Sequence, residues 1–187
     1  MPSWARVATR SRVPLGFIFA AGYLWFARTT WAFLLGGAGI VLIGIVVRTL
    51  ASGHIRKNTE LAVTGPYSYT RNPLYLGSIL IALGFIVAAR NLWIGLAAAA
   101  MFAFVYLPVI KAEESYLRSA FPDYALYARH VPRFLPRLTP YHADAATDAG
   151  GRRFSAELYL RHREYNAALG SVLMIGALIL KMMLVLH

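Results

Sequence analysis

Two adjacent glutamates, Glu113 and Glu114, are one candidate for chemistry in this sequence. They follow a long apolar run, so a helix leaving a membrane would carry them. Two carboxylates close to lipid are unfavourable unless each has a cationic partner. That partner is either a cationic ligand or one of the basic residues Arg71, Lys111 and Arg118. The residues alone leave both roles open, ligand binding and structural ion pairing.

A second candidate is the segment from Arg71 to Gly77, which begins another apolar run. Pro73 suits the first turn of a helix, where its missing N–H has no partner to lose. Arg71 and Asn72 are therefore expected at a helix N-terminus, where free N–H groups and the helix dipole attract carboxylate or phosphate. The plainer interpretation is an arginine that binds lipid phosphate at the membrane surface.

Several kinds of site are excluded or unsupported. The chain has no cysteine, which excludes disulfides, thiolate metal sites and cysteine nucleophiles. His54 and His130 match no metal-ligand spacing, so we expect no metal. The glycine run from Gly36 to Gly39 lies inside an apolar stretch and lacks the strand–turn–helix context of a dinucleotide site.

The elements that must position these residues are apolar helices. Charged residues make up 14% of the 187 residues, against about 25% in a soluble domain, and the mean hydropathy is +0.53. We therefore predict an all-α, polytopic integral membrane protein with a single membrane domain over residues 1–187. Its five predicted transmembrane helices cover residues 13–27, 31–47, 74–89, 92–110 and 167–186.

The distribution of basic residues predicts the orientation. Of the 19 Lys and Arg residues, three precede the first apolar stretch, four lie between the second and third, and nine lie in residues 111–163. Arg28 and Arg90 occupy the two short loops of the other side, and Lys181 lies inside the last stretch. The positive-inside rule then places the N-terminus and the long loops in the cytoplasm and the C-terminus on the opposite side. The net charge of +11 favours membrane lipids, not nucleic acid, as the partner.

The two candidate segments together resemble the isoprenylcysteine carboxyl methyltransferase family, within a wider group that includes phospholipid methyltransferases. The family pattern combines a Gly-x-Tyr turn, an Arg-His-Pro-x-Tyr-x-Gly helix start, a helical hairpin, a Glu-Glu-x-x-Leu-x-x-x-Phe segment, spaced tyrosines and an Arg-x-x-Pro end. The resemblance covers residues 59–136. The matching residues here are Gly65, Tyr67, Arg71, Pro73, Tyr75, Gly77, Glu113, Glu114, Leu117, Phe121, Tyr124, Tyr127, Arg133 and Pro136.

The resemblance implies an S-adenosylmethionine pocket built from these two segments at the cytoplasmic face. Glu113 would neutralise the cofactor's ammonium group, and the helix N-terminus beginning at Asn72 would accept its carboxylate. Residues 139–153 are expected to be a flexible linker, and the helix over residues 167–186 lies outside the family pattern. The cofactor-binding residues implied are Thr59, Glu60, Leu61, Ala62, Tyr67, Asn72, Pro73, Leu74, Tyr75 and Glu113.

Two departures from the family pattern affect the substrate. Asn72 stands where the family has histidine, so proton transfer at that position is lost. Val109 stands where well-studied members carry an arginine that orients a carboxylate substrate, with Lys111 the nearest replacement.

We hypothesise direct transfer of the sulfonium methyl group to a lipophilic acceptor that enters from the bilayer. Arg71 would hold a phosphate or carboxylate of the substrate, and Glu114 would be the base if the acceptor is an amine or thiol. A carboxylate acceptor needs no base. The alternatives are a sterol-reductase-like membrane enzyme that uses NADPH and a non-catalytic membrane module. The sequence does not predict the oligomeric state.

Overall fold

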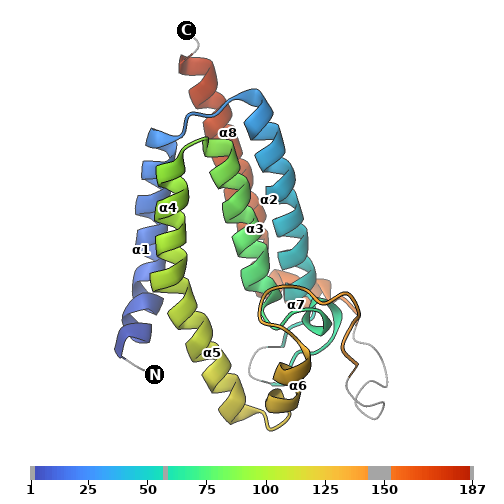
Figure 1. Ribbon diagram of the computed structural model, residues 1–187. Helices are drawn as coiled ribbons and strands as arrows, with labels where there is room; N and C mark the ends of the chain where they lie inside the picture. Colours follow the sequence, from blue (N-terminus) through green and yellow to red (C-terminus); the bar gives the residue numbers. More distant parts are fainter. Residues whose placement is uncertain (1–2, 57–58, 143–152, 186–187) are drawn as a thin grey trace.

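The structure is a computed structural model that describes residues 3–56, 59–142 and 153–185. Within these ranges it contains helices and no strands, as the sequence predicts (Figure 1). The long helices are α1 (Ser3–Phe26), α2 (Trp31–Ser52), α3 (Pro73–Ala89), α4 (Leu92–Met101), α5 (Leu107–Ala120) and α8 (Tyr165–Val185). The shorter elements are a 3-10 turn (Gly65–Ser68), a π-helical segment (Phe102–Tyr106), α6 (Tyr124–His130) and α7 (Ala156–Arg161).

Three helices are long and apolar enough to cross a membrane: Trp31–Ser52, Leu92–Ala120 and Tyr165–Leu184. The apolar parts of α1 and α3, Pro14–Phe26 and Pro73–Ala89, are shorter. The predicted count of five spans is therefore supported for three helices. α3 is short because Pro73 begins it and Arg90 ends it in the left-handed conformation, with φ of 49°.

α4 and α5 form one continuous helix, joined by the π-helical segment Phe102–Tyr106 (Figure 1). The helix runs past the predicted end of the fourth apolar stretch at residue 110 and continues to Ala120. Glu113 and Glu114 therefore lie on its polar final turns, as the sequence predicts. Pro108 lies two residues after the π-helical segment, and because proline has no N–H it interrupts the helical hydrogen bonds at this junction.

α2 and α3 pack at close range because glycines of one helix face the backbone of the other. A Cβ built on Gly44 would lie 2.7 Å from the Gly77 carbonyl oxygen and 2.8 Å from the Ile81 backbone nitrogen. Gly37 and Gly84 form a second contact of the same kind, nearer the other end of the pair. Small residues let the two backbones approach, which is how helices associate where water is absent. These glycine contacts fix the position of α3 along α2, and therefore where α3 begins.

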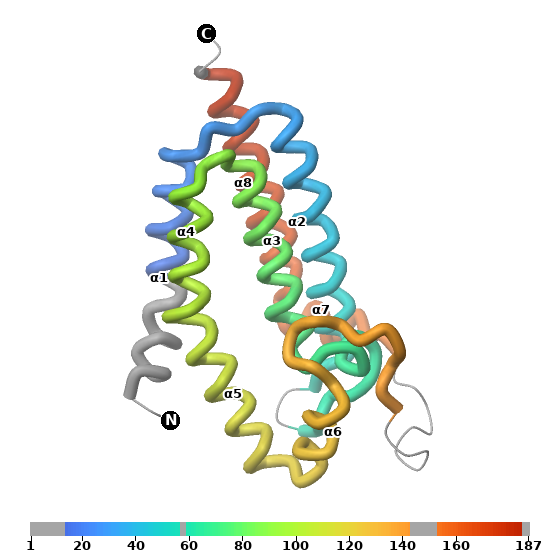
Figure 2. The backbone as a smooth tube through the Cα atoms, in the orientation of Figure 1, coloured from blue at the N-terminus to red at the C-terminus, as the bar shows by residue number. Residues whose placement is uncertain are grey.

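Two packed regions lie at opposite ends of the helices. Where α1, α2, α3, α4 and α8 meet, buried apolar residues form a core that includes Tyr23, Leu34 and Leu178. At the other end, Tyr124, Tyr127 and Val131 are buried against the loop that precedes α3. Figure 2 shows the path of the chain, in which α6 lies beyond the end of α5 and beside the segments that flank the start of α3.

Most of the predicted linker over residues 139–153, namely residues 143–152, lies outside the described residues. Where the chain resumes it contacts the end of α2: the Ser155 N–H donates to the Gly53 carbonyl at 3.0 Å. The Phe154 ring lies against Gly53 at a distance that leaves no room for a Cβ. The segment before α8 is therefore attached to the same end of the molecule that carries Glu113 and Glu114.

Candidate functional site

Glu114 lies at the centre of a buried polar cluster. Its carboxylate accepts from the Arg133 guanidinium through two nitrogens, with Nη2–Oε2 at 2.6 Å and Nε–Oε1 at 3.0 Å. The Asn72 amide donates to Oε1 at 3.1 Å, and Arg71 Nη1 lies 3.7 Å from the same oxygen. The Glu114 side chain is 8% exposed. These four residues, Arg71, Asn72, Glu114 and Arg133, are called the Glu114 cluster below.

The Glu114 cluster joins three parts of the chain that are distant in sequence. Glu114 comes from α5, Arg71 and Asn72 precede α3, and Arg133 follows α6. The backbone reinforces the junction, because the Arg71 N–H donates to the Pro132 carbonyl at 2.9 Å. The hydrogen bonds that Arg133 donates to Glu114 raise the pKa of Arg133, so this guanidinium stays charged. One carboxylate faces two guanidinium groups, which gives the cluster a net charge of about +1 and makes it attractive to an anion.

Two donors beside the cluster have no partner in the described part of the chain. The Tyr67 hydroxyl and Arg71 Nε are both buried from solvent without a hydrogen bond. The remaining Arg71 contact is weak, since Nη1 lies 3.5 Å from the Tyr124 hydroxyl oxygen. Most buried polar groups in folded proteins are hydrogen-bonded, so these two donors are candidates to bind an acceptor group.

Tyr67 is held in place by its backbone. The Tyr127 hydroxyl of α6 donates to the Tyr67 carbonyl at 2.7 Å. Burial raises the pKa of Tyr67, and the nearby negative charges of Glu164 and Glu113 raise it further. The Tyr67 hydroxyl is therefore neutral at physiological pH and can donate a hydrogen bond.

Glu113 differs from Glu114 in every contact. It is exposed, and it forms no ion pair or hydrogen bond with the residues that the structure describes. The prediction left a ligand role and an ion-pair role open for these two glutamates. The structure places Glu114 in ion pairs with Arg71, as one of the predicted partners, and with Arg133. The Glu113 carboxylate is left available for a ligand.

The start of α3 is held by Arg48 of α2. The Arg48 guanidinium donates to the Leu74 carbonyl at 3.2 Å and bonds the Ser78 hydroxyl. It also pairs with Glu164, with Nη2–Oε2 at 2.6 Å, at the segment before α8. Pro73 is buried and Asn72 is the N-cap residue, but the Asn72 side chain donates to Glu114 instead of capping the helix. The first turn of α3 is thus fixed from two sides.

Four of the predicted cofactor residues, at positions 59–62, lie in the loop before the 3-10 turn, and Tyr75 lies in α3. The Thr59 hydroxyl donates to the Arg56 carbonyl. Glu60 and Arg56 form a surface ion pair, with Glu60 Oε1 3.9 Å from Arg56 Nε. Leu61 packs on the buried Tyr124 and Tyr127 cluster, which brings this loop to the α6 side of the site. Ala62 and Tyr75 are both half-buried.

A cavity of about 430 Å³ lies against the start of α3. Pro73 is the one predicted cofactor residue that lines it, so this cavity does not coincide with the predicted cofactor pocket. Its lining is otherwise almost wholly apolar: Val47, Leu50, His54, Gly65, Pro66, Tyr69, Thr70, Leu76 and Pro136.

The sequence prediction missed three residues that hold the site together. The family pattern includes Arg133 in its Arg-x-x-Pro end but gives it no role. Arg133 and Glu114 are 19 residues apart in sequence, so no local pattern indicates that they pair. Arg48 was counted as a loop charge, although it lies on α2 and faces α3. Glu164 lies beyond the family pattern. A basic residue within a helix next to an apolar run is the signal that identifies Arg48, because such residues are rarely unpaired.

Comparisons with known proteins agree with the resemblance. The sequence model described as phospholipid methyltransferase matches residues 17–124. The chain is 34% identical over 143 residues to the cobalt-zinc-cadmium resistance protein CzcN of Cupriavidus metallidurans. It is 37% identical over 90 residues to the nickel-cobalt-cadmium resistance protein NccN of Alcaligenes xylosoxydans xylosoxydans. These matches cover 72% and 48% of this chain but 65% and 42% of the two relatives. No solved structure matches significantly.

Proposed function

We propose that this chain, which belongs to the phospholipid methyltransferase family, transfers the methyl group of S-adenosylmethionine to a lipophilic acceptor at the Glu114 cluster. The family match supports a membrane methyltransferase, and the match spans the start of α3 and the two glutamates of α5. S-adenosylmethionine supplies a methyl group on a cationic sulfur, which leaves as a neutral thioether when a nucleophile attacks. In this proposal the residues of this chain bind and orient the cofactor and the acceptor, and they exclude water from the reaction.

The observation that carries the proposal is the set of unpaired polar groups around the Glu114 cluster. The Tyr67 hydroxyl and Arg71 Nε are buried donors without partners, and Glu113 is a carboxylate without a partner in the described chain. An amino-acid moiety such as that of S-adenosylmethionine presents the complementary groups, an ammonium and a carboxylate. Glu113 would accept from the ammonium, and Arg71 and Tyr67 would donate to a carboxylate.

The state of Glu114 favours an acceptor that needs no base. Oxygen Oε1 accepts from Arg133 and Asn72, and Oε2 accepts from Arg133 at 2.6 Å. Because both oxygens of this carboxylate are already occupied by donors, its role is to orient Arg71 and Arg133. We therefore assign Glu114 a positioning role and favour a carboxylate over an amine or thiol as the methyl acceptor. Arg71 would bind the anionic group of the substrate or cofactor.

The apolar cavity beside α3 supports a lipophilic acceptor. Its volume of about 430 Å³ falls in the range of small-molecule sites, and its lining is almost wholly apolar. It adjoins Pro73 and Thr70, whose neighbours Asn72 and Arg71 belong to the Glu114 cluster. An acyl or prenyl chain in this cavity would leave the polar end of the acceptor beside Arg71.

The test is cofactor binding by the purified protein in detergent, measured calorimetrically. Wild type should bind S-adenosylmethionine and not NADPH. Glu113→Gln should weaken binding roughly ten- to a hundredfold, the effect of removing one charge-assisted hydrogen bond. Because Glu113 is exposed and unpaired in the described chain, the thermal unfolding midpoint of the Glu113→Gln variant should equal that of wild type.

The matched control is Glu157→Gln, which removes an exposed, unpaired glutamate on α7. It should bind the cofactor as wild type does. A wild-type protein that binds NADPH in preference would support the reductase alternative. A folded protein that binds neither compound would support a non-catalytic module, and equal weakening by both variants would remove the role given to Glu113.

A further inference from the structure

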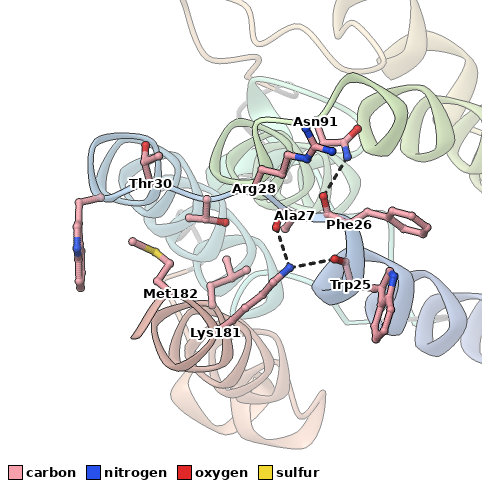
Figure 3. Close-up of a pocket in the computed structure, with 11 residues that line it drawn as sticks. Trp25, Phe26, Ala27, Arg28, Thr30, Asn91, Lys181 and Met182 are labelled. Carbon is pink, nitrogen blue, oxygen red and sulfur yellow. Dashed lines mark hydrogen bonds between the residues drawn. The ribbon is translucent and has the colours of Figure 1, made fainter. Parts of the chain in front are cut away.

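A second site lies at the opposite end of the helices from the Glu114 cluster. A cavity of about 660 Å³ opens where α1 ends, α2 begins and α8 passes by (Figure 3). Its apolar lining comes from Trp25, Phe26, Ala27, Trp31, Leu178 and Met182, and its polar lining from Arg28, Thr29, Thr30, Asn91 and Lys181. No residue of the proposed methyltransferase site contributes to it.

The walls of this cavity are fixed by hydrogen bonds. The Lys181 ammonium donates to the Trp25 and Ala27 carbonyls, at 3.0 and 2.8 Å (Figure 3). It also donates to the Leu24 carbonyl at 2.7 Å. These carbonyls belong to the last turn of α1 and the residue after it, where no helical N–H is available. The Asn91 amide donates to the Phe26 carbonyl at 3.0 Å. The connection from α1 to α2 is therefore held in one conformation.

Positive charge at this cavity is not neutralised by any acid in the described residues. Lys181 satisfies its three N–H groups with carbonyls, but no carboxylate pairs with it. The Arg28 guanidinium is exposed and makes no hydrogen bond or ion pair with the described part of the chain. All eight carboxylates of the sequence lie between Glu60 and Glu164, and the described ones lie towards the other end of the helices.

A hydrogen-bond donor also faces this region without a partner. The Thr29 hydroxyl oxygen is buried from solvent and forms no hydrogen bond in the described chain. Its backbone neighbour is fixed, because the Arg28 N–H donates to the Ala89 carbonyl at 2.8 Å. A buried hydroxyl without a partner is unfavourable unless a ligand or water satisfies it.

From these observations we infer that the cavity binds an anionic glycerophospholipid. The phosphodiester has acceptor oxygens that match the free donors of Arg28 and Thr29, with Lys181 adding charge without donating. The exposed apolar surfaces of Phe26 and Trp31 would contact an acyl chain, and the exposed Trp25 is typical of a membrane interface. A zwitterionic lipid fits less well, since its ammonium finds no carboxylate here. This inference is independent of the proposed methyl transfer.

Lipid retention tests the inference. The purified protein is exchanged into nanodiscs of equal phosphatidylglycerol and phosphatidylcholine with identical acyl chains, and retained lipid is measured by native mass spectrometry after release. Wild type should retain phosphatidylglycerol in preference. Arg28→Gln should lower that preference about tenfold, the effect of one charge-assisted hydrogen bond. Arg129→Gln removes an equally exposed arginine from α6 and should leave the preference unchanged.

Thr29→Val separates ligand binding from structure. Removing an unsatisfied buried hydroxyl leaves stability unchanged or raises it, so the unfolding midpoint in lipid-free detergent should not fall. Retention of phosphatidylglycerol should fall severalfold. Equal retention of both lipids by wild type would overturn the inference, as would equal effects of Arg28→Gln and Arg129→Gln. Displacement of the lipid by millimolar inorganic phosphate would assign the cavity to a free anion and overturn the lipid assignment.

Discussion

At the residue scale, the site depends on which donors and acceptors are already paired. Glu114 accepts hydrogen bonds from Arg133 and Asn72, while the neighbouring Glu113 has no partner in the described chain. Successive residues of an α-helix point about 100° apart, so one carboxylate faces α3 and the other does not. Tyr67 combines the two conditions, with a bonded carbonyl and an unpaired hydroxyl.

Tyr67→Phe should separate the hydroxyl's role in binding from any role in stability. Because the hydroxyl has no partner, the variant should unfold at the wild-type urea concentration at neutral pH. Its affinity for S-adenosylmethionine should fall severalfold if the hydroxyl contacts the cofactor. Calorimetric binding and urea unfolding measure the two effects, and a clear loss of stability with unchanged affinity would contradict the assignment.

The difference in stability between wild type and Tyr67→Phe should depend on pH. Burial raises the pKa of Tyr67 above the ordinary tyrosine value of about 10. Below that pH the hydroxyl is neutral in the folded and unfolded chains, so it causes no change. Above it the unfolded chain ionises first, and wild type should lose stability relative to Tyr67→Phe by about 1.4 kcal/mol per pH unit. Tyr116→Phe, on an exposed ring, should follow wild type, and parallel curves for all three proteins would contradict the prediction.

At the scale of elements, the position of α3 relative to α2 determines where the predicted cofactor residues of α3 lie. The glycine contacts set the separation of the two helices, and Arg48 fixes the first turn of α3 through Leu74 and Ser78. Glu164 in turn orients Arg48, and it belongs to the segment beyond the matched residues 17–124. The extra C-terminal helix of this chain is therefore attached to the site through one ion pair.

Gly44→Ala should destabilise the protein by about 1–3 kcal/mol, because its Cβ would lie 2.7 Å from the Gly77 carbonyl oxygen. Gly39→Ala is the matched control on the same helix, since no atom lies within 4 Å of its built Cβ. There the helix gains about 0.5–1 kcal/mol from the lower flexibility of alanine. Thermal unfolding in detergent measures both, and equal effects would contradict the close packing of α2 and α3.

The ion pair between Arg48 and Glu164 should be coupled to cofactor affinity. Arg48→Lys cannot maintain contacts with Leu74, Ser78 and Glu164 at once, because lysine lacks the planar fork. We expect severalfold weaker binding of S-adenosylmethionine by Arg48→Lys and by Glu164→Gln. The double variant should bind S-adenosylmethionine no more weakly than the single variant with the larger effect, which corresponds to a coupling energy of about 1–2 kcal/mol. Additive effects would show that the two residues act separately.

At the scale of the whole molecule, the sequence predicted the features that repeat along the chain and missed those that depend on distant pairing. Apolar length predicted an all-helical protein, and the described residues contain helices and no strands. Pro73 correctly marked the first residue of α3. The pairing of Arg133 with Glu114 and of Arg48 with Glu164 follows from tertiary contacts across 19 and 116 residues, which no local pattern encodes.

The orientation in the membrane and the span status of α3 can be tested together, because the chain contains no native cysteine. Thr30→Cys lies between α1 and α2, and Ala120→Cys ends α5; both positions are exposed. Three helical passes separate them, α2, α3 and α4 with α5 (Figure 1). If all three cross the bilayer, an impermeant maleimide should label the two cysteines from opposite sides, with Ala120→Cys reacting in inside-out vesicles. Labelling of both from the same side would show that the 17 residues of α3 do not span, which would leave two crossings and place the Glu114 cluster differently relative to the membrane.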